Sequence, residues 1–229
     1  MIAPALLLLL APLSFSQGSS PVAGGVVSSK EWRVRRGADK EEEFIGDVRY
    51  RTGASVIRSD WALYKHAAQT WQLRGHVKVD RALDSGDTVE SVGDKAFAEM
   101  LKKTGWMTAE DRVAVTRTPA DGTEPDRARA RRLEWEGKTR GALIGEVHLW
   151  GPRLEGWADR ADYDEPTGEI LMTGGRPVTR KFAGWAADDD WSGALKGDTV
   201  RAWQSKRTLA ADGKVVGWLE FKDVKGLKK

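Results

Sequence analysis

Apolar and polar residues alternate along most of the chain from Phe44 onward. Runs such as DVRYR, HVKVD, RVAVTR, EVHLW and EILM are separated by clusters of glycine, aspartate and threonine. A period of two is typical of strands with one buried face, because successive side chains point to opposite faces of a sheet. We therefore expect an all-β fold of short strands joined by turns.

One segment leaves two interpretations open. Residues 94–103, DKAFAEMLKK, could form a helix that is capped by Asp94 and ended by Gly105, with apolar residues on one face. The internal repeat described next instead predicts a strand and a turn over the same residues.

The chain contains an internal repeat. The stretch that begins at Gly46 aligns without a gap with the stretch that begins at Gly145. Weaker copies lie between and after them, and two of these place Trp135 and Trp203 at the position of a tyrosine. Each unit has roughly 30 to 40 residues and reads as a strand, a turn and a return strand. The paired identities are Gly46/Gly145, Val48/Val147, Asp60/Asp159, Ala62/Ala161, Tyr64/Tyr163, Gly75/Gly174 and Val79/Val178.

The repeat explains the acidic stretch ADRADYDEPTGEILMTGG at residues 158–175. An acidic cluster beside a tyrosine suggests a calcium or sugar site, but most of these carboxylates are not kept in the other strong copy. What the copies share is the strand, the turn and the apolar return, which indicates architecture. Asp162, Asp164 and Glu165 are replaced there by Leu63, Lys65 and His66.

The order of these motifs resembles the OstA-like repeat of lipopolysaccharide transport proteins, the LptA-like family. The resemblance covers Phe44 to about Lys222 and is clearest in ADRADY at 158–163, the Thr167-Gly168 turn and Gly174. Family units commonly close on Gly-Asn-Val, whereas this chain has no asparagine and keeps only the glycine and the valine.

The resemblance implies an open antiparallel β-jellyroll, or β-taco, built from repeated strand-turn-strand units. It implies a non-enzymatic protein that holds lipopolysaccharide or a related envelope lipid in an apolar groove and passes it toward the outer membrane. Partners would be other OstA-like domains, or further copies of this chain, joined by pairing of edge strands. Candidate groove residues are Val48, Tyr50, Trp71, Leu73, Val77, Val79, Val147, Leu149, Ile170 and Met172.

Three arginines in EWRVRRG are candidates for contact with lipid phosphates near the groove mouth, namely Arg33, Arg35 and Arg36. The other interpretation is a segment that is only solubilised by its charge. For each apolar candidate the other interpretation is a closed core, because inward positions pack in every jellyroll.

Two other functions stay open. The eleven tryptophans are unusual beside three tyrosines and five phenylalanines, and they suit a carbohydrate-binding module with its tryptophans on an outer, polar face. The third hypothesis is a purely structural repeat protein of the envelope.

The ends of the chain differ from its middle. Residues 1–16 are apolar and uncharged, too short to span a bilayer, and fit a secretory signal peptide. Residues 17–43 are rich in glycine, serine and charge and are expected to form a flexible leader, 44–222 the jellyroll, and 223–229 a basic tail. Without cysteine the exported chain has no disulfides, which favours a periplasmic location.

Catalytic chemistry has little support in the sequence. The three histidines are scattered, and we find no zinc-protease, serine-hydrolase or phosphate-loop motif. Asp188, Asp189 and Asp190 lack the alternating spacing of a calcium loop and suit a solvated loop. A formal charge of +3 does not suggest nucleic acid. We therefore expect no catalytic residue, metal ligand or cofactor.

Overall fold

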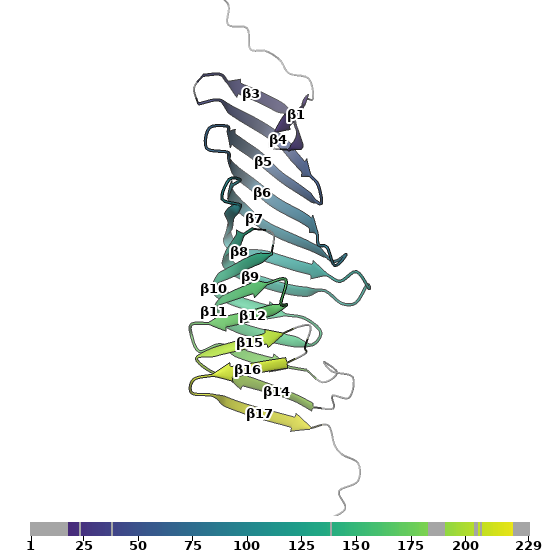
Figure 1. The fold of residues 1–229 in the computed structure, drawn as a ribbon, viewed down its shortest axis with the longest axis vertical. Helices are drawn as coiled ribbons and strands as arrows, with labels where there is room; N and C mark the ends of the chain where they lie inside the picture. Colours follow the sequence, from purple (N-terminus) through teal and green to yellow (C-terminus); the bar gives the residue numbers. More distant parts are fainter. Residues whose placement is uncertain are drawn as a thin grey trace, which may run out of the picture.

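A computed structural model describes residues 18–22, 24–37, 39–137, 139–182, 191–203, 206 and 208–221. Within these residues, seventeen strands form one sheet in which every pairing is antiparallel (Figure 1). The all-β prediction is confirmed. The expected signal peptide at 1–16, the triple aspartate at 188–190 and the basic tail at 223–229 lie outside the described residues.

The sheet forms a tall stack with the N-terminal strands at one end and the C-terminal strands at the other (Figure 1). From β4 to β11 each strand pairs with the next one along the chain. The strands are β1 (Gly18–Val22), β2 (Gly25–Ser29), β3 (Glu31–Arg35), β4 (Glu41–Thr52), β5 (Ser55–Lys65), β6 (Thr70–Ala82), β7 (Thr88–Glu99), β8 (Thr104–Thr118), β9 (Asp126–Glu136), β10 (Arg140–Trp150), β11 (Leu154–Asp164), β12 (Glu169–Thr173), β13 (Val178–Lys181), β14 (Trp191–Lys196), β15 (Thr199–Trp203), β16 (Thr208–Asp212) and β17 (Val216–Phe221).

The flexible leader expected at 17–43 is wrong, because three strands lie there. β2 pairs with the end of β4, and β3 pairs with its beginning. Their charges pair across strands: an Arg35 Nη1 lies 2.9 Å from a carboxylate oxygen of Glu41. Val27 is fully buried. The jellyroll therefore begins before Phe44.

The sheet divides at β11. β12 pairs with residues 160–164 of β11, and β13 pairs with residues 154–157. One branch continues as β12, β15 and β16, and the other as β13, β14 and β17. The two branches overlie each other at the lower end of Figure 1. The predicted open antiparallel jellyroll is confirmed.

Of the two readings of residues 94–103, the strand and turn are correct and the helix is wrong. β7 runs to Glu99, and a turn follows at residues 100–103. Lys103 closes this turn with a φ of 55° and donates its N–H to the Met100 carbonyl. Because Ala96 and Ala98 face inward at alternate positions of the strand, helical spacing of the apolar residues was a coincidence.

A row of β-bulges runs along the middle of the stack, and we call it the spine. At Gly46-Asp47, Gly75-His76 and Gly145-Glu146 two successive residues have positive φ, and the strand pairing shifts there. Bulges bend a strand and increase its twist. Each long strand therefore contributes its first half to one wall of a trough and its second half to the other.

The spine gives the retained aspartates a structural role. Asp60 lies over Gly75, where any added Cβ would clash with the aspartate side chain. Asp159 lies over Gly174, whose added Cβ would be 2.8 Å from the Asp159 Cβ. Both glycines have positive φ, near 75°. The aspartate and glycine repeat because they form the bend.

The ungapped register of the repeat fails beyond Gly174. Val79 is an inward residue, whereas Val178 pairs with the exposed Trp157 and so lies on the outer face. The second copy has a break at residues 174–177 that separates β12 from β13, and a slip of one residue moves side chains to the opposite face. Trp203 also faces outward, where its indole N–H donates to Glu169.

Two apolar clusters form the core. The larger one joins β2 to β8 and centres on Phe44, Trp71 and Met107. The smaller one joins β9 to β12 and β15 around Val147, Met172 and Val200. Between these two clusters the walls of the trough do not meet, and a cavity remains.

Candidate functional site

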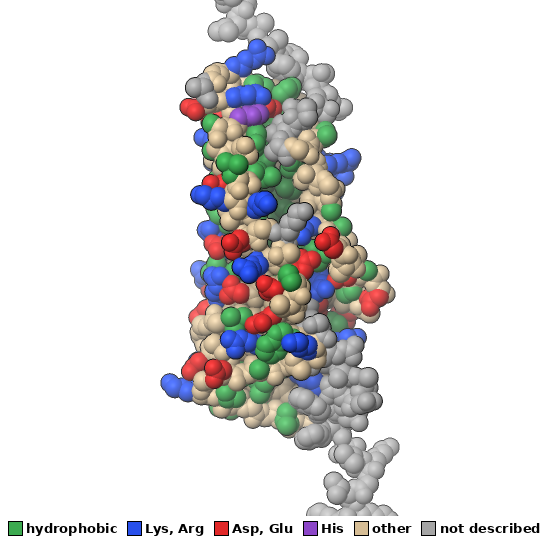
Figure 2. Space-filling view, viewed as in Figure 1, with side chains coloured by type: hydrophobic (Ala, Val, Ile, Leu, Met, Phe, Trp, Pro, Cys, Tyr) green, Lys and Arg blue, Asp and Glu red, His purple; other side chains and the backbone are tan. Residues whose placement is uncertain are grey.

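A cavity of about 910 Å³ runs inside the trough and is lined by residues from β4 to β12. Figure 2 shows hydrophobic side chains at the bottom of a hollow in the upper half of this face, with charged side chains over the middle. Seven of the ten groove candidates line it: Val48, Tyr50, Trp71, Leu73, Val79, Leu149 and Ile170.

The other three candidates lie elsewhere. Val77, Val147 and Met172 are almost completely buried in the two clusters and do not line the cavity. Val77 and Val147 directly follow the spine bulges, where the two walls converge. Strand alternation gave the correct face for them but could not give their depth.

Several lining residues were missed because they belong to the weaker copies of the repeat. The drift of these copies hid their inward positions, although Trp135 stood at the aligned tyrosine position. The missed apolar lining residues of the weaker copies include Met107, Val115, Leu133, Trp135 and Leu143. Tyr163, in the second strong copy, also lines the cavity and was missed.

An aromatic wall lies at the N-terminal part of the cavity. The Trp71 ring centroid is 4.8 Å from that of Tyr64 and 5.1 Å from that of Tyr50, and burial raises the pKa of Tyr50. The buried indole N–H of Trp71 has no hydrogen-bond partner in the described structure. An unpaired buried donor costs about 1–3 kcal/mol of folding free energy. Complete closure of the core around the Trp71 indole is therefore unfavourable.

Small residues keep the lumen open beside this wall. Trp71, Ala98, Gly105 and Trp135 are cross-strand neighbours in that order, on β6, β7, β8 and β9. An added Cβ at Gly105 would overlap the Trp135 ring. The Trp135 ring therefore lies over Gly105, and Ala98 stands between the two indoles.

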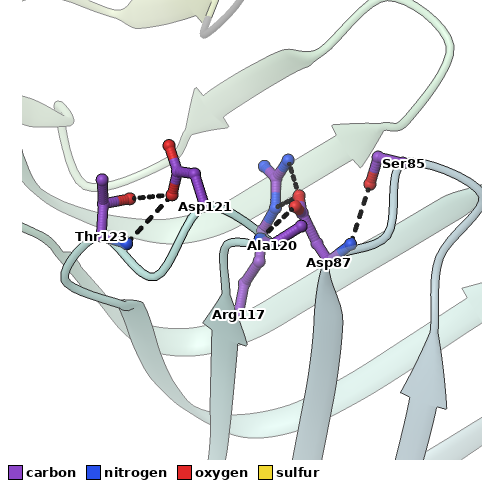
Figure 3. A network of polar contacts seen from close by, with 6 residues as sticks. All are labelled: Ser85, Asp87, Arg117, Ala120, Asp121 and Thr123. Atoms are coloured by element: carbon purple, nitrogen blue, oxygen red, sulfur yellow. Dashed lines mark hydrogen bonds and ion pairs between the residues drawn. The ribbon is translucent and has the colours of Figure 1, made fainter.

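One rim of the trough is formed by the loops that follow β4, β6, β8 and β10. Figure 3 shows the network of polar contacts around Asp87 in this rim. The Arg117 guanidinium donates Nε and Nη2 to Asp87, at 2.9 and 2.6 Å. Asp87 also accepts the Ala120 N–H at 3.0 Å, and Asp121 accepts the backbone N–H and the hydroxyl of Thr123. The rim is thus fixed by charged hydrogen bonds.

Asp87 is ionised by these contacts. Its burial opposes ionisation, but the Ala120 N–H and the Arg117 guanidinium outweigh burial and lower the pKa of Asp87. Nearby Asp126 also lines the cavity, and there burial dominates and raises the pKa. The same rim of the cavity therefore carries an ionised carboxylate, Asp87, and a more easily protonated one, Asp126.

Replacing Asp87 with asparagine is expected to lower the free energy of unfolding at neutral pH by about 1–3 kcal/mol, because Arg117 loses its anionic partner. Because the pKa of Asp87 is lowered in the folded state, its ionised carboxylate stabilises the fold fully at pH values above the ordinary aspartate pKa of about 3.9. This stabilisation is lost as the pH falls through the lowered pKa of the folded state. The difference between wild type and Asp87→Asn, measured by urea unfolding, should shrink in acid. A difference that stays constant into acid would contradict this assignment.

The two rims meet across the trough. Arg81, at the end of β6, lies 3.8 Å from Glu165, in the turn after β11, and both line the cavity. Arg81 belongs to the first rim, and Glu165 to the second one, formed by the turns after β5, β7, β9 and β11. This pair bridges the trough partway along its length.

The arginines proposed for phosphate contact do not line the cavity. Arg33 pairs with Glu31, and Arg35 pairs with Glu41, on the exposed surface of β3 and β4. Arg36 is exposed in the turn after β3. The arginines that do line the cavity are Arg81, Arg117, Arg127, Arg140 and Arg153.

The tryptophans and histidines divide between structural and surface positions. Trp71, Trp135 and Trp150 line the cavity, while Trp157 and Trp218 are exposed. Each histidine lies beside a carboxylate: His66 contacts Glu42, His76 contacts Asp60 and His148 contacts Glu155, at 2.7 to 3.0 Å.

No cluster of three or more histidine, aspartate or glutamate side chains in the described ranges could hold a metal ion. Among the same residues, no helix is long and apolar enough to cross a membrane.

The fold and cavity define a bent-strand, antiparallel β-jellyroll with an internal apolar groove. No protein-family model matches the chain, and no curated protein sequence matches it. Among solved structures it is similar to a chain described as LptH, the LptA-homologous periplasmic component of the lipopolysaccharide transport device of Pseudomonas aeruginosa. The TM-score is 0.40 at 10% identity, with 72% of this chain and 93% of that chain covered.

Proposed function

We propose that this protein is a periplasmic carrier that holds the acyl chains of lipopolysaccharide or a related envelope lipid in the trough. The observation that carries the proposal is the cavity of about 910 Å³ lined by apolar side chains of both walls. This volume lies at the upper end of the range for small-molecule sites. Residues 1–16 would act as the export signal, and no catalytic step is involved.

The energetics favour an amphiphilic ligand over a closed core. Burying a CH₂ group is worth about 0.8 kcal/mol, so walls that fail to meet leave favourable contacts unmade. An acyl chain supplies those contacts along Leu73, Ala96 and Leu133, which line the cavity, while its polar end stays at a charged rim. A ligand that is apolar at one end and anionic at the other fits this arrangement.

The rim arginines are better candidates for lipid phosphate than those of β3. Arg127 and Arg153, at the first rim, line the cavity, whereas Arg33 and Arg35 lie on the outer surface of β3 and β4. Guanidinium groups bind phosphate bidentately. We assign the anionic head group of the lipid to this rim.

Passage of lipid along the stack requires partners at its ends. In the described structure, β3 pairs with β4 alone, and β17 pairs with β14 alone. Such unpaired strand edges are templates for another strand. Similar domains, or copies of this chain, would extend the trough by edge pairing.

In-vivo photocrosslinking tests the proposal. A photoreactive residue at Val115 or Leu149, both of which line the cavity, is expected to crosslink to lipopolysaccharide. The same residue at Ala114, adjacent to Val115 but on the outer face, is the matched control. Equal crosslinking from Ala114 and Val115, or none from either cavity position, would overturn the carrier function.

A further inference from the structure

A second pocket, of about 400 Å³, lies on the outer face of β10, β11, β13 and β14, away from the groove. Its lining combines one exposed indole with charged groups of both signs. The residues that matter here are Trp157, Val178, Lys196, Asp159, Arg176 and Arg112.

The floor and walls of this pocket are a row of cross-strand neighbours. His148, Trp157, Val178 and Lys196 follow one another on adjacent strands. The His148 ring is stacked on Trp157 at 5.2 Å with an angle of 7° between the planes. Because histidine covers one face of the indole, the other face is turned toward Val178.

The slot over Val178 has the width of one saturated ring. Trp157 and Lys196 are two strands apart, so their backbones are roughly 10 Å apart. The indole forms one side, the Lys196 side chain the other and the small Val178 the floor. Trp157 is 40% exposed, so its free face is accessible to a ligand.

The polar groups around the slot are available. Lys196 and Arg176 have no carboxylate partner among the described residues, although Arg176 donates to the Lys214 carbonyl. Arg112, in contrast, is held by Glu146. The Asp159 carboxylate is exposed and also lacks an ion-pair partner in the part of the chain that is described.

The other strong copy of the repeat shows that the fold does not require this arrangement. Arg58 stands there in place of Trp157 and pairs with Asp80. Asp60, the counterpart of Asp159, contacts His76 at 2.7 Å, and Gly175 replaces that histidine. The second copy has therefore exchanged a guanidinium for an indole and left its spine carboxylate open.

We propose that this outer pocket binds an anionic sugar, independently of the groove. The C–H face of the sugar ring stacks on Trp157, its hydroxyls donate to Asp159, and its anionic substituent binds Lys196 and Arg176. Charge-assisted hydrogen bonds to an anion are the stronger ones, and an aromatic ring with one open face supplies the apolar contact.

Titration of the full chain with glucose 6-phosphate, followed by two-dimensional NMR of the indole N–H groups, tests the proposal. The Trp157 signal is expected to shift with saturation at millimolar concentrations. Glucose alone and inorganic phosphate alone are expected to bind at least about fivefold more weakly, since each lacks part of the contact set. Equal binding of glucose would overturn the anionic assignment, and equal binding of phosphate would overturn the sugar.

Two variants and a control sharpen the test. Trp157→Arg copies the residue of the other repeat, so it is expected to keep the melting temperature and lose sugar phosphate binding. Lys196→Gln is expected to weaken glucose 6-phosphate at least about fivefold and leave glucose unchanged. Trp218→Arg changes another exposed indole and is expected to bind normally. Full binding by folded Trp157→Arg would refute the site.

Discussion

Replacing Ala98 with tryptophan is expected to abolish lipid capture while the protein stays folded. Ala98 lines the cavity on β7, next to Trp71 on one side and to Gly105, with the Trp135 ring above it, on the other. A third indole in this row fills the lumen between the two existing ones. We expect lipopolysaccharide crosslinking from Val115 to fall at least about tenfold, equivalent to ~1.4 kcal/mol of binding free energy.

The matched control is Ala114→Trp, the same substitution on the neighbouring strand β8. Ala114 pairs with the exposed Val92 and faces away from the cavity. This variant is expected to crosslink as wild type does. Because Ala98 lines the cavity, the new side chain of Ala98→Trp can extend into it, and its melting temperature should stay close to that of Ala114→Trp. Undiminished crosslinking in a folded Ala98→Trp protein would mean that lipid does not pass this point of the trough.

The periodicity of the chain predicted the meander well, because β4 to β11 mostly alternate between inward apolar and outward polar residues, with exceptions such as the exposed Val92 and Trp157. It also identified positions such as Leu73 and Leu149 that line the cavity. Alternation has no information about depth, and for that reason Val77 and Val147 were grouped with them although both are core residues. The distance between the walls is set by the spine bend, which no single strand encodes.

Two other features escaped the sequence for different reasons. β3 carries Glu31, Arg33 and Arg35 on one face and Trp32 and Val34 on the other, and its ion pairs with β4 depend on a partner strand that composition cannot reveal. The slip at residues 174–177 turns Val178 outward, although it aligns with the inward Val79. A one-residue change in register leaves the local pattern intact and reverses the face. That slip also forms the floor of the outer pocket.

Truncation before Gly217 is expected to abolish self-association and leave a folded monomer. β17 pairs with β14 along one edge only within the described structure. Trp218 and Leu219, on opposite faces of this strand, are 55% and 59% exposed. Proteins usually protect such an edge with lysine, proline or a bulge. The apolar residues retained here instead fit a strand that awaits a partner.

The truncation removes all of β17 except Val216. A point variant therefore separates the loss of edge pairing from the loss of the strand itself. Leu219→Lys keeps the backbone hydrogen bonds to β14 and places a charge on the edge, which disfavours pairing with another chain. We expect both proteins to be monomeric in light scattering at concentrations where wild type forms oligomers. Their crosslinking from Val115 should persist, because the cavity is lined by β4 to β12 and not by β17. Oligomers that survive the truncation would show that β17 is not the associating edge and would direct attention to β3 at the other end of the stack.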